Sequence, residues 1–426
     1  PADARSNPVQ ISLDWFTHRK HPMLPFAQRL QNVETSAIRE LFKLLGQPGI
    51  ISFAGGFPDP ALFDVEGFKA ATRTALQTWP DAALQYGATE GFGPLKEQIA
   101  ALCTAKGATV SEQQFIVTTG SQQALDLIAK CMVSPGDKVI VESPTFLAAI
   151  QCFRLYGAQT IAAPTDAHGV QPDRLEQLIV EHKPKLVYLI PTFGNPSGAT
   201  LTLERRKRVL KLAAQYQTLV VEDDPYGDLY FDAPPPPSLL ALAPQVPGSA
   251  DWLAHCGSLS KILAPGLRLG WLVAPPALLA NAVMCKQFSD ANTSTLAQTT
   301  ATAYLQSGRL SAALAQVRSV YAARARQMAT SLHHELGDAV AFSAPQGGMF
   351  FWVRLTGTNG CTTDAALYAK QAIEKRVAFV PGAAFFAEHP DPSCLRMSFA
   401  TANEESIVEG IARMAHALQM PPMSQQ

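Results

Sequence analysis

The chain has 426 residues, of which 47% are hydrophobic and 16% charged, and its formal net charge is −1. This length suits one large domain and a smaller one with sizeable cores, and the balanced charge disfavours binding to polyanions such as nucleic acids and anionic membranes. No apolar run is long enough to span a bilayer, so we expect no membrane partner either.

The first residues, 1–19, mix charged and amide side chains and lack the apolar segment of a secretory signal, so a cytoplasmic protein is expected. The seven cysteines are odd in number, scattered and never in C-x-x-C spacing, which argues against a disulfide framework and against structural zinc. The nine histidines form no metal-ligand pattern, and we predict no metal site.

From about residue 90 to 275, short β-branched runs alternate with longer stretches of helical periodicity. This alternation is typical of an α/β fold, with a mostly parallel central sheet and helices on both faces. Functional groups are then expected at the carboxyl ends of the strands. The expected strands are 115–118, 138–142, 185–190, 218–222, 252–256 and 268–274, and the helices between them include 121–132 and 203–216.

The residues that follow predict a second, smaller unit. Residues 233–248 include four consecutive prolines and are expected to form a surface loop. A long helical stretch at about 295–337 leads to strand-like patterns at 350–354 and 395–399, which indicate a smaller α+β domain. We therefore divide the chain into an N-terminal arm (1–55), a large domain (56–307) and a small C-terminal domain (308–426).

The first candidate site residues follow the strand 115–118. Gly120 turns the chain into a helix, so the free N–H groups at the helix start, together with Ser121 and Gln122, suit an anion such as phosphate. An ordinary helix cap would explain Ser121 as well. After the next strand, Phe146 reaches the same edge of the sheet, where its ring either stacks on a planar ligand or packs in the core.

The next two strand ends bring polar groups that suit a pyridine ring. Asn195 stands in a turn, and Asp223 precedes the phenol of Tyr226 by three residues. A carboxylate beside a pyridine nitrogen keeps that nitrogen protonated, while an amide and a phenol can bond a ring oxygen. Taken singly, Asn195 would be a turn residue and Asp223 a surface acid.

A lysine follows the strand 252–256. The amine of Lys261 can form a Schiff base with an aldehyde, and Ser258, Ser260 and Arg268 can hold a dianionic phosphate. Alone, so short a motif more often marks a lysine in solvent at a strand end. The agreement of several strand-end segments, in one order, favours a common binding site.

In their residues and in their order along the chain, these segments resemble the class I and II aminotransferases, which are fold-type-I pyridoxal 5'-phosphate enzymes. The resemblance covers nearly the whole chain. The resemblance implies that Lys261 carries the cofactor, that Asp223 pairs with the pyridine nitrogen, and that Asn195 and Tyr226 contact the ring oxygen. The stacking position is Phe146, where many relatives have tyrosine. The phosphate contacts carry over to Ser121, Gln122, Ser258, Ser260 and Arg268.

The same resemblance assigns substrate contacts. Arg396 matches the arginine that binds the substrate α-carboxylate as a bidentate pair. Segments 36–40 and 52–60 are similar to the subgroup of 2-aminoadipate and kynurenine aminotransferases, some of which use the arginine matching Arg39 for a distal carboxylate. A surface arginine paired with a neighbouring acid is the alternative for Arg39. Gly56 either lets the backbone approach the substrate or serves a turn.

The resemblance further implies a homodimer in which Tyr86 reaches the phosphate of the partner subunit, although Tyr86 could instead be a packing aromatic.

The implied function is ping-pong transfer of an amino group, with Lys261 as anchor and base, from an L-amino acid to a 2-oxo acid such as 2-oxoglutarate. The donor is 2-aminoadipate, glutamate or a broad aromatic and aliphatic set. A lyase or decarboxylase that uses the same cofactor stays open. An aminotransferase-like effector-sensing domain is disfavoured, because the residues before Gly56 show no helix-turn-helix and no basic excess.

Overall fold

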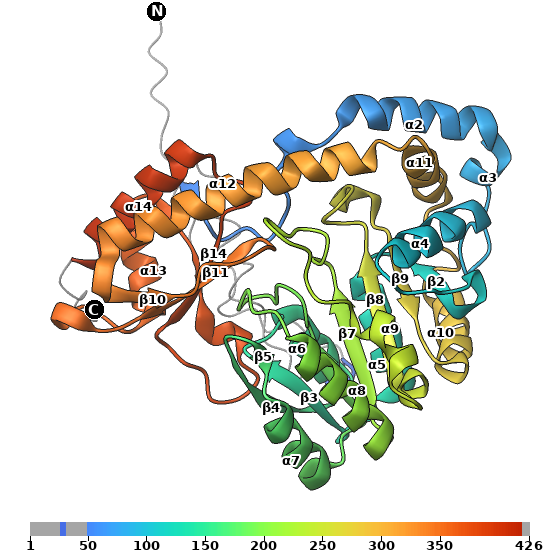
Figure 1. Ribbon diagram of the computed structural model, residues 1–426, viewed down its shortest axis with the longest axis horizontal. Helices are drawn as coiled ribbons and strands as arrows, with labels where there is room; N and C mark the ends of the chain where they lie inside the picture. The colour runs from blue at the N-terminus through green and yellow to red at the C-terminus, as the bar shows by residue number, and fades with distance from the viewer. Residues whose placement is uncertain (1–25, 31–48, 420–426) are drawn as a thin grey trace, which may run out of the picture.

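The computed structural model describes residues 26–30 and 49–419. Figure 1 shows two units side by side, with the long helix α12 (Leu310–Leu336) extending from one to the other. The larger unit is built on an eight-stranded sheet and the smaller on a four-stranded sheet. This arrangement confirms the predicted α/β fold with a smaller α+β unit, while the residue bounds of the three-part division stay a prediction.

The large sheet has the strand order β2-β9-β8-β7-β6-β3-β4-β5. Its central strands β8, β7, β6, β3 and β4 all run parallel, and antiparallel pairs occur only towards the two edges. The strands are β2 (Phe115–Thr118), β3 (Lys138–Ser143), β4 (Gln159–Asp166), β5 (Gly169–Val170), β6 (Leu186–Leu189), β7 (Leu219–Asp224), β8 (Leu253–Ser258) and β9 (Gly270–Val273).

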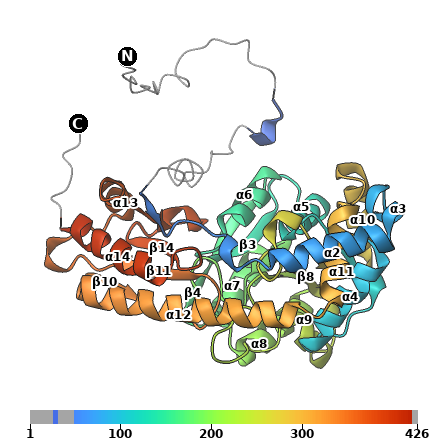
Figure 2. The same ribbon diagram turned by 90° about the horizontal axis from the view of Figure 1, so that it is seen from above.

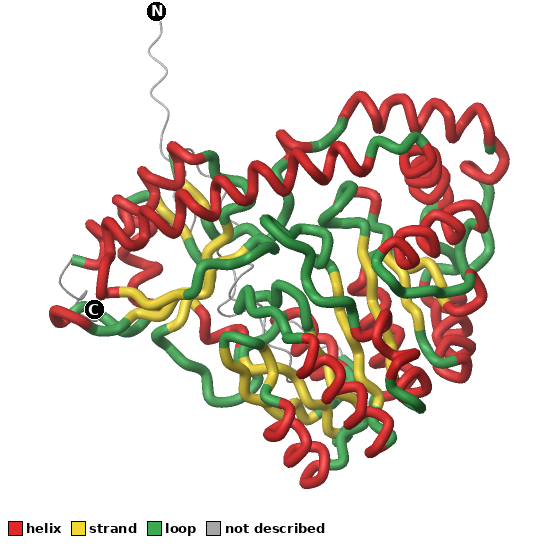
Figure 3. The backbone as a smooth tube through the Cα atoms, viewed as in Figure 1, coloured by secondary structure: helices red, strands yellow, loops and turns green. Residues whose placement is uncertain are grey.

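Helices cover both faces of this sheet (Figure 3) because successive strand residues point to opposite sides. In β3, Val139 and Val141 join the core on the side of α5, whereas Ile140 joins the core on the side of α7 and α8. The helices on the first side are α5 (Ser121–Met132), α6 (Leu147–Leu155) and α10 (Pro276–Ser289), and those on the second are α7 (Pro172–His182), α8 (Leu203–Tyr216) and α9 (Leu239–Leu242).

The small unit holds an antiparallel sheet of order β10-β11-β14-β13. Its elements are β10 (Val340–Phe342), β11 (Phe350–Leu355), α13 (Ala365–Glu374), β12 (Val377–Ala378), β13 (Val380–Pro381), β14 (Cys394–Ser398) and α14 (Glu404–Leu418). The short strand β1 (Ile51–Ser52) pairs with β12, so the chain enters the large unit from the small one.

Further helices gather at the end of the molecule away from α13 and α14 (Figure 2). They are α2 (Val65–Thr78), α3 (Pro80–Leu84), α4 (Gly93–Ala105) and α11 (Thr295–Gln306). No helix in the described part of the chain is long and apolar enough to cross a membrane.

The prediction of a surface loop at 233–248 is wrong for its second half, where the structure has the short helix α9. The prolines end before Ser238, whose hydroxyl caps α9 by accepting the N–H of Ala241 at 3.1 Å. The buried carboxylate of Glu222 accepts the N–H groups of Leu239 and Leu240 at 2.7 and 3.0 Å. Ser238 is a cap that the local sequence contains, whereas the hydrogen bonds from the helix start to Glu222, a distant strand residue, leave no local signal.

Two other boundaries also differ from the expectation. The helical stretch 295–337 is two helices, α11 and α12, separated by Gly308 with φ +74°. The strand expected from 268 begins at Gly270, because Arg268 has a left-handed conformation with φ +53° that no strand continues.

Gly270 connects the fold to the predicted phosphate turn. A Cβ there would lie 2.8 Å from backbone atoms of Gly120, Ser121 and Gly257, which cannot rotate away as a side chain would. We expect Gly270→Ala to lower the free energy of unfolding by about 1–3 kcal/mol, the range for overpacking a core. Urea denaturation measures this, with Gly266→Ala as control because a Cβ at Gly266 meets no atom within 4 Å. Equal stabilities of the two variants would contradict the prediction.

Candidate active site

A cavity of about 350 Å³ opens where the parallel strands β3, β6, β7 and β8 end. Parallel strands that end at one edge of a sheet bring the loops after them together, which is why segments far apart in sequence meet here. The predicted site residues that line the cavity are Gly56, Ser121, Gln122, Phe146, Asn195, Asp223, Tyr226, Ser258, Ser260, Lys261, Arg268 and Arg396. Tyr86 does not line it, and Arg39 lies outside the described residues.

One end of the cavity is suited to a phosphate. Helix α5 begins at Ser121, directly after Gly120 with φ +78°, so its free N–H groups and positive dipole end face this part of the site. The guanidinium of Arg268 lies against the turn, 3.4 Å from the carbonyl oxygen of Thr119. Ser258 and Ser260 add hydroxyl groups from the other side. The result is a cup of donors with a net positive character.

The middle of the cavity contains the carboxylate of Asp223, which is only 3% exposed at the end of β7. The hydroxyl of Tyr188 donates to its Oδ2 at 2.7 Å, while its Oδ1 is buried without a hydrogen-bond partner among the described residues. Burial raises the pKa of Asp223 to about 6, and the Tyr188 hydrogen bond acts against this rise. At neutral pH the site therefore offers one unpaired carboxylate oxygen, which fits a protonated ring nitrogen.

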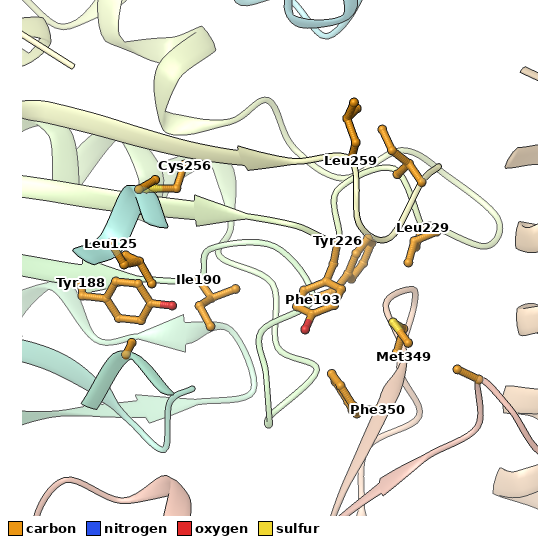
Figure 4. Close-up of a cluster of buried hydrophobic side chains, with 14 of the residues drawn as sticks. Leu125, Tyr188, Ile190, Phe193, Tyr226, Leu229, Cys256, Leu259, Met349 and Phe350 are labelled. Carbon is orange, nitrogen blue, oxygen red and sulfur yellow. The ribbon is translucent and has the colours of Figure 1, made fainter. Parts of the chain in front are cut away.

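Figure 4 shows a cluster of buried hydrophobic side chains, in which Tyr188 lies beside Ile190 and Tyr226 lies near Phe193 and Phe350. Tyr226 meets Phe350 edge to face, with 5.9 Å between the ring centroids. Its hydroxyl accepts a long hydrogen bond, 3.4 Å, from the side-chain amide of Asn195. The two groups predicted to share a ring oxygen thus lie next to each other.

Lys261 lies in the cavity with its Nζ donating to the carbonyl oxygen of Gly56 at 2.7 Å. Burial, with the positive charges of Arg396 and Arg268, lowers the pKa of Lys261 to about 8. A lysine with so low a pKa is a far better nucleophile and base at neutral pH than a surface lysine.

Arg396 comes from the small unit, at the centre of β14. It donates from Nη1 to Asn195 Oδ1 and from Nη2 to the carbonyl oxygen of Ala54, both at 2.9 Å. Its guanidinium lies over the rings of Phe350 and Phe385 at 4.4 and 4.9 Å. Its Nε is buried without a hydrogen-bond partner among the described residues, and burial lowers the pKa of Arg396 to about 10. Because no acid of the described residues forms an ion pair with it, this buried cation suits an incoming carboxylate.

The structure adds residues that the sequence analysis missed. Phe57, Leu147, Gln151 and Phe385 also line the cavity, and Tyr188 bonds Asp223 from beneath it. These side chains have no charged or polar group that would suit a phosphate or a pyridine ring, apart from the Gln151 amide and the Tyr188 hydroxyl, and Tyr188 is one aromatic in a buried strand. Only the pairing of β6 with β7 brings Tyr188 to the carboxylate.

Comparison with known proteins points to one family. Residues 63–414 match the family described as aminotransferase class I and II. The chain is 39% identical to the 2-aminoadipate transaminase of Thermus thermophilus and 38% identical to the aromatic-amino-acid aminotransferase 1 of Thermococcus litoralis. Each match covers 92% of this chain, with 96% of the first protein and 94% of the second.

A solved structure is similar over the same length. It is the alpha-aminoadipate aminotransferase from Thermus thermophilus, complexed with N-(5'-phosphopyridoxyl)-L-leucine. The TM-score is 0.84 and the identity 38%, with 92% of this chain and 97% of that chain covered.

The lowered pKa of Lys261 predicts how the free protein reacts with pyridoxal phosphate. Because an amine reacts with an aldehyde only when neutral, the rate should rise about tenfold per pH unit below pH 8 and level off above it. Stopped-flow absorption with cofactor-free protein measures this rate, and Lys106→Ala is the control for other lysines. A rate that keeps rising to pH 10 would show that the Lys261 amine has an ordinary pKa.

Proposed function

Because the chain belongs to the class I and II aminotransferase family and is a pyridoxal 5'-phosphate-dependent transaminase, we propose that it moves the amino group of aromatic, aliphatic and acidic L-amino acids to 2-oxoglutarate. The single observation that carries this proposal is the cavity itself. Four groups face one space: a buried carboxylate with an oxygen that has no partner among the described residues, a lysine of low pKa, a phosphate cup, and a buried arginine with no acidic partner among those residues.

These residues fit the cofactor that the family uses. The phosphate would be held by the start of α5, Ser258, Ser260 and Arg268, and the ring nitrogen by the free oxygen of Asp223. Asn195 and Tyr226 lie where they can bond the ring oxygen, and Phe146 can pack against the ring. When bound, the cofactor supplies an electron sink that stabilises negative charge at the substrate Cα.

The chain's own groups divide the remaining work. Arg396 binds the α-carboxylate through its guanidinium, replacing contacts that it now makes to Asn195 and the carbonyl of Ala54. Lys261, once its amine is free, takes the proton from the substrate Cα. Its hydrogen bond to the carbonyl of Gly56 shows one position in which the free amine is held within the site.

The substrate side chain would meet a mostly apolar wall. Phe57, Leu147 and Phe385 line the cavity beside the neutral amide of Gln151. Its described lining contains no cation besides Lys261, Arg268 and Arg396, all of which have roles above. The described residues thus favour aromatic and aliphatic side chains, and an acidic side chain would require Arg39.

We also propose a cytoplasmic homodimer in which Tyr86 reaches the partner's phosphate cup. Tyr86 is 85% exposed, and Leu84 and Phe288 are further large apolar side chains that the single chain leaves exposed. The Tyr86 segment is held in place by the hydroxyl of Thr295, which bonds the carbonyl oxygens of Ala83 and Gln85 at 3.1 and 3.0 Å. An exposed ring on an anchored segment is suited to contact a second copy.

The visible absorption spectrum tests the reaction. The purified protein should show a band of lysine-bound cofactor that shifts to shorter wavelength when glutamate or 2-aminoadipate is added, and Lys261→Ala should lack the band. Analysis of products with 2-oxoglutarate then separates transamination from a lyase or decarboxylase. Loss of the α-carboxylate, or ammonia release without formation of glutamate, would contradict the proposed reaction.

A substitution of Arg39 tests whether this residue binds the side chain of acidic substrates. If it binds a distal carboxylate, Arg39→Ala should reduce kcat/KM for 2-aminoadipate about tenfold to a hundredfold, the scale of one charge-assisted hydrogen bond, and leave leucine unchanged. The exposed Arg29 offers a matched control as Arg29→Ala. Equal losses for both substrates would show that Arg39 does not distinguish between them.

A further inference from the structure

Tyr188, a buried tyrosine of β6 beneath the cavity, donates a hydrogen bond from its hydroxyl to Asp223. Packing in a strand alone does not require this hydroxyl. We propose that Tyr188 is a positioning residue for the ring nitrogen of the cofactor, because its hydroxyl occupies one oxygen of Asp223 and leaves the other free and correctly aimed. The proposal rests on the proposed binding of pyridoxal phosphate in this site.

The geometry assigns the two oxygens different tasks. In the parallel pairing of β6 and β7, Tyr188 lies opposite Val221, and Asp223 is the next residue of β7 on the same face. The ring therefore extends along the strand towards the cavity, and its hydroxyl meets Asp223 Oδ2 at 2.7 Å. Oδ1 remains without a partner among the described residues, and Asp223 itself lines the cavity.

The tyrosine is held rigidly and keeps its proton. Its side chain is fully buried and packs edge to face against Phe153, with 5.8 Å between the ring centroids. Burial, together with the charge of Asp223, raises the pKa of Tyr188 well above 10. A hydroxyl that stays protonated at every working pH has one hydrogen to donate, and Asp223 accepts it.

The other charged groups around Asp223 do not replace this donor. On β7, Glu222 and Asp224 raise its pKa, whereas His255 on β8 lowers it. The His255 ring is already bonded to Glu222 at 2.8 Å. Further titratable groups near the pair are Tyr226, the Cys256 thiol on β8 and the Glu142 carboxyl on β3.

Without the Tyr188 hydroxyl, the rise in the pKa of Asp223 that burial causes would be opposed mainly by His255. Its pKa would then rise above about 6, and more of the carboxyl would be neutral at pH 7. A neutral and freely rotating carboxyl is a poorer acceptor for a ring N–H, and either oxygen could then turn away from the cavity.

The experiment compares two ligands that differ only at the ring nitrogen. Cofactor-free protein is titrated with pyridoxal phosphate and with the analogue in which a C–H group replaces the ring nitrogen, and binding is followed by fluorescence. Tyr188→Phe should weaken binding of pyridoxal phosphate about tenfold and leave the analogue unchanged, because only the former uses Asp223 Oδ1. As the pH is lowered, the preference for pyridoxal phosphate should also disappear at a higher pH in this variant than in the wild type, because Asp223 becomes protonated earlier.

The matched control is Tyr368→Phe, which also removes a fully buried hydroxyl, one that donates to the carbonyl oxygen of Met414 at 2.8 Å in the small unit. It should lose stability without a change in the preference between the ligands. Thermal denaturation shows that both variants are folded, and Asp223→Asn provides the reference in which the preference is lost.

The outcomes distinguish a failure of the proposed cofactor binding from a failure of the positioning role of Tyr188. If the wild type does not bind pyridoxal phosphate through Lys261, the proposed function fails and this inference fails with it. If the wild type prefers pyridoxal phosphate and Asp223→Asn abolishes that preference, but Tyr188→Phe keeps it or weakens both ligands equally, Tyr188 is only a structural residue.

Discussion

A carboxylate buried between the strands of a sheet loses several kcal/mol of hydration unless other groups replace the water. Asp223 is in this position, and the site is arranged around its incomplete compensation. The Tyr188 hydroxyl bonds one oxygen, while the other has no hydrogen-bond partner in the part of the chain that the structure describes. A ligand that brings an N–H donor to this second oxygen restores a hydrogen bond to a group that burial has largely removed from water, so Asp223 favours a protonated ring nitrogen.

The positive charges of the site are likewise not balanced within the cavity. Lys261, Arg268 and Arg396 line one cavity, and the two arginines help to lower the pKa of the lysine. Two anions relieve this repulsion, a phosphate at the start of α5 and a carboxylate at Arg396. Charge balance therefore favours cofactor and substrate together, and in the free protein the repulsion contributes to lowering the pKa of the Lys261 amine to about 8.

The two units divide these tasks by their topology. The parallel strand ends of the large sheet carry the groups suited to the cofactor, and β14 of the small sheet carries Arg396. The segment after β1 brings the carbonyls of Ala54 and Gly56 to Arg396 and Lys261. The substrate end of the cavity is thus assembled where the large sheet, the small sheet and the incoming chain meet.

The sequence by itself determined the elements whose signals are local. The alternating runs predicted the parallel sheet, and the strand ends placed Ser121, Asn195, Asp223, Lys261 and their neighbours at one edge, because parallel strands leave no other arrangement. Tertiary structure alone decided what depends on distant partners. Tyr188 meets Asp223 only because β6 pairs with β7, and the start of α9 after the prolines is held by Glu222. Phe385 reaches the cavity from the small unit, and pKa values such as that of Lys261 depend on charges brought together from separate strands. Local pattern specifies which groups a strand presents, whereas register, burial and the field of remote charges exist only in the folded chain.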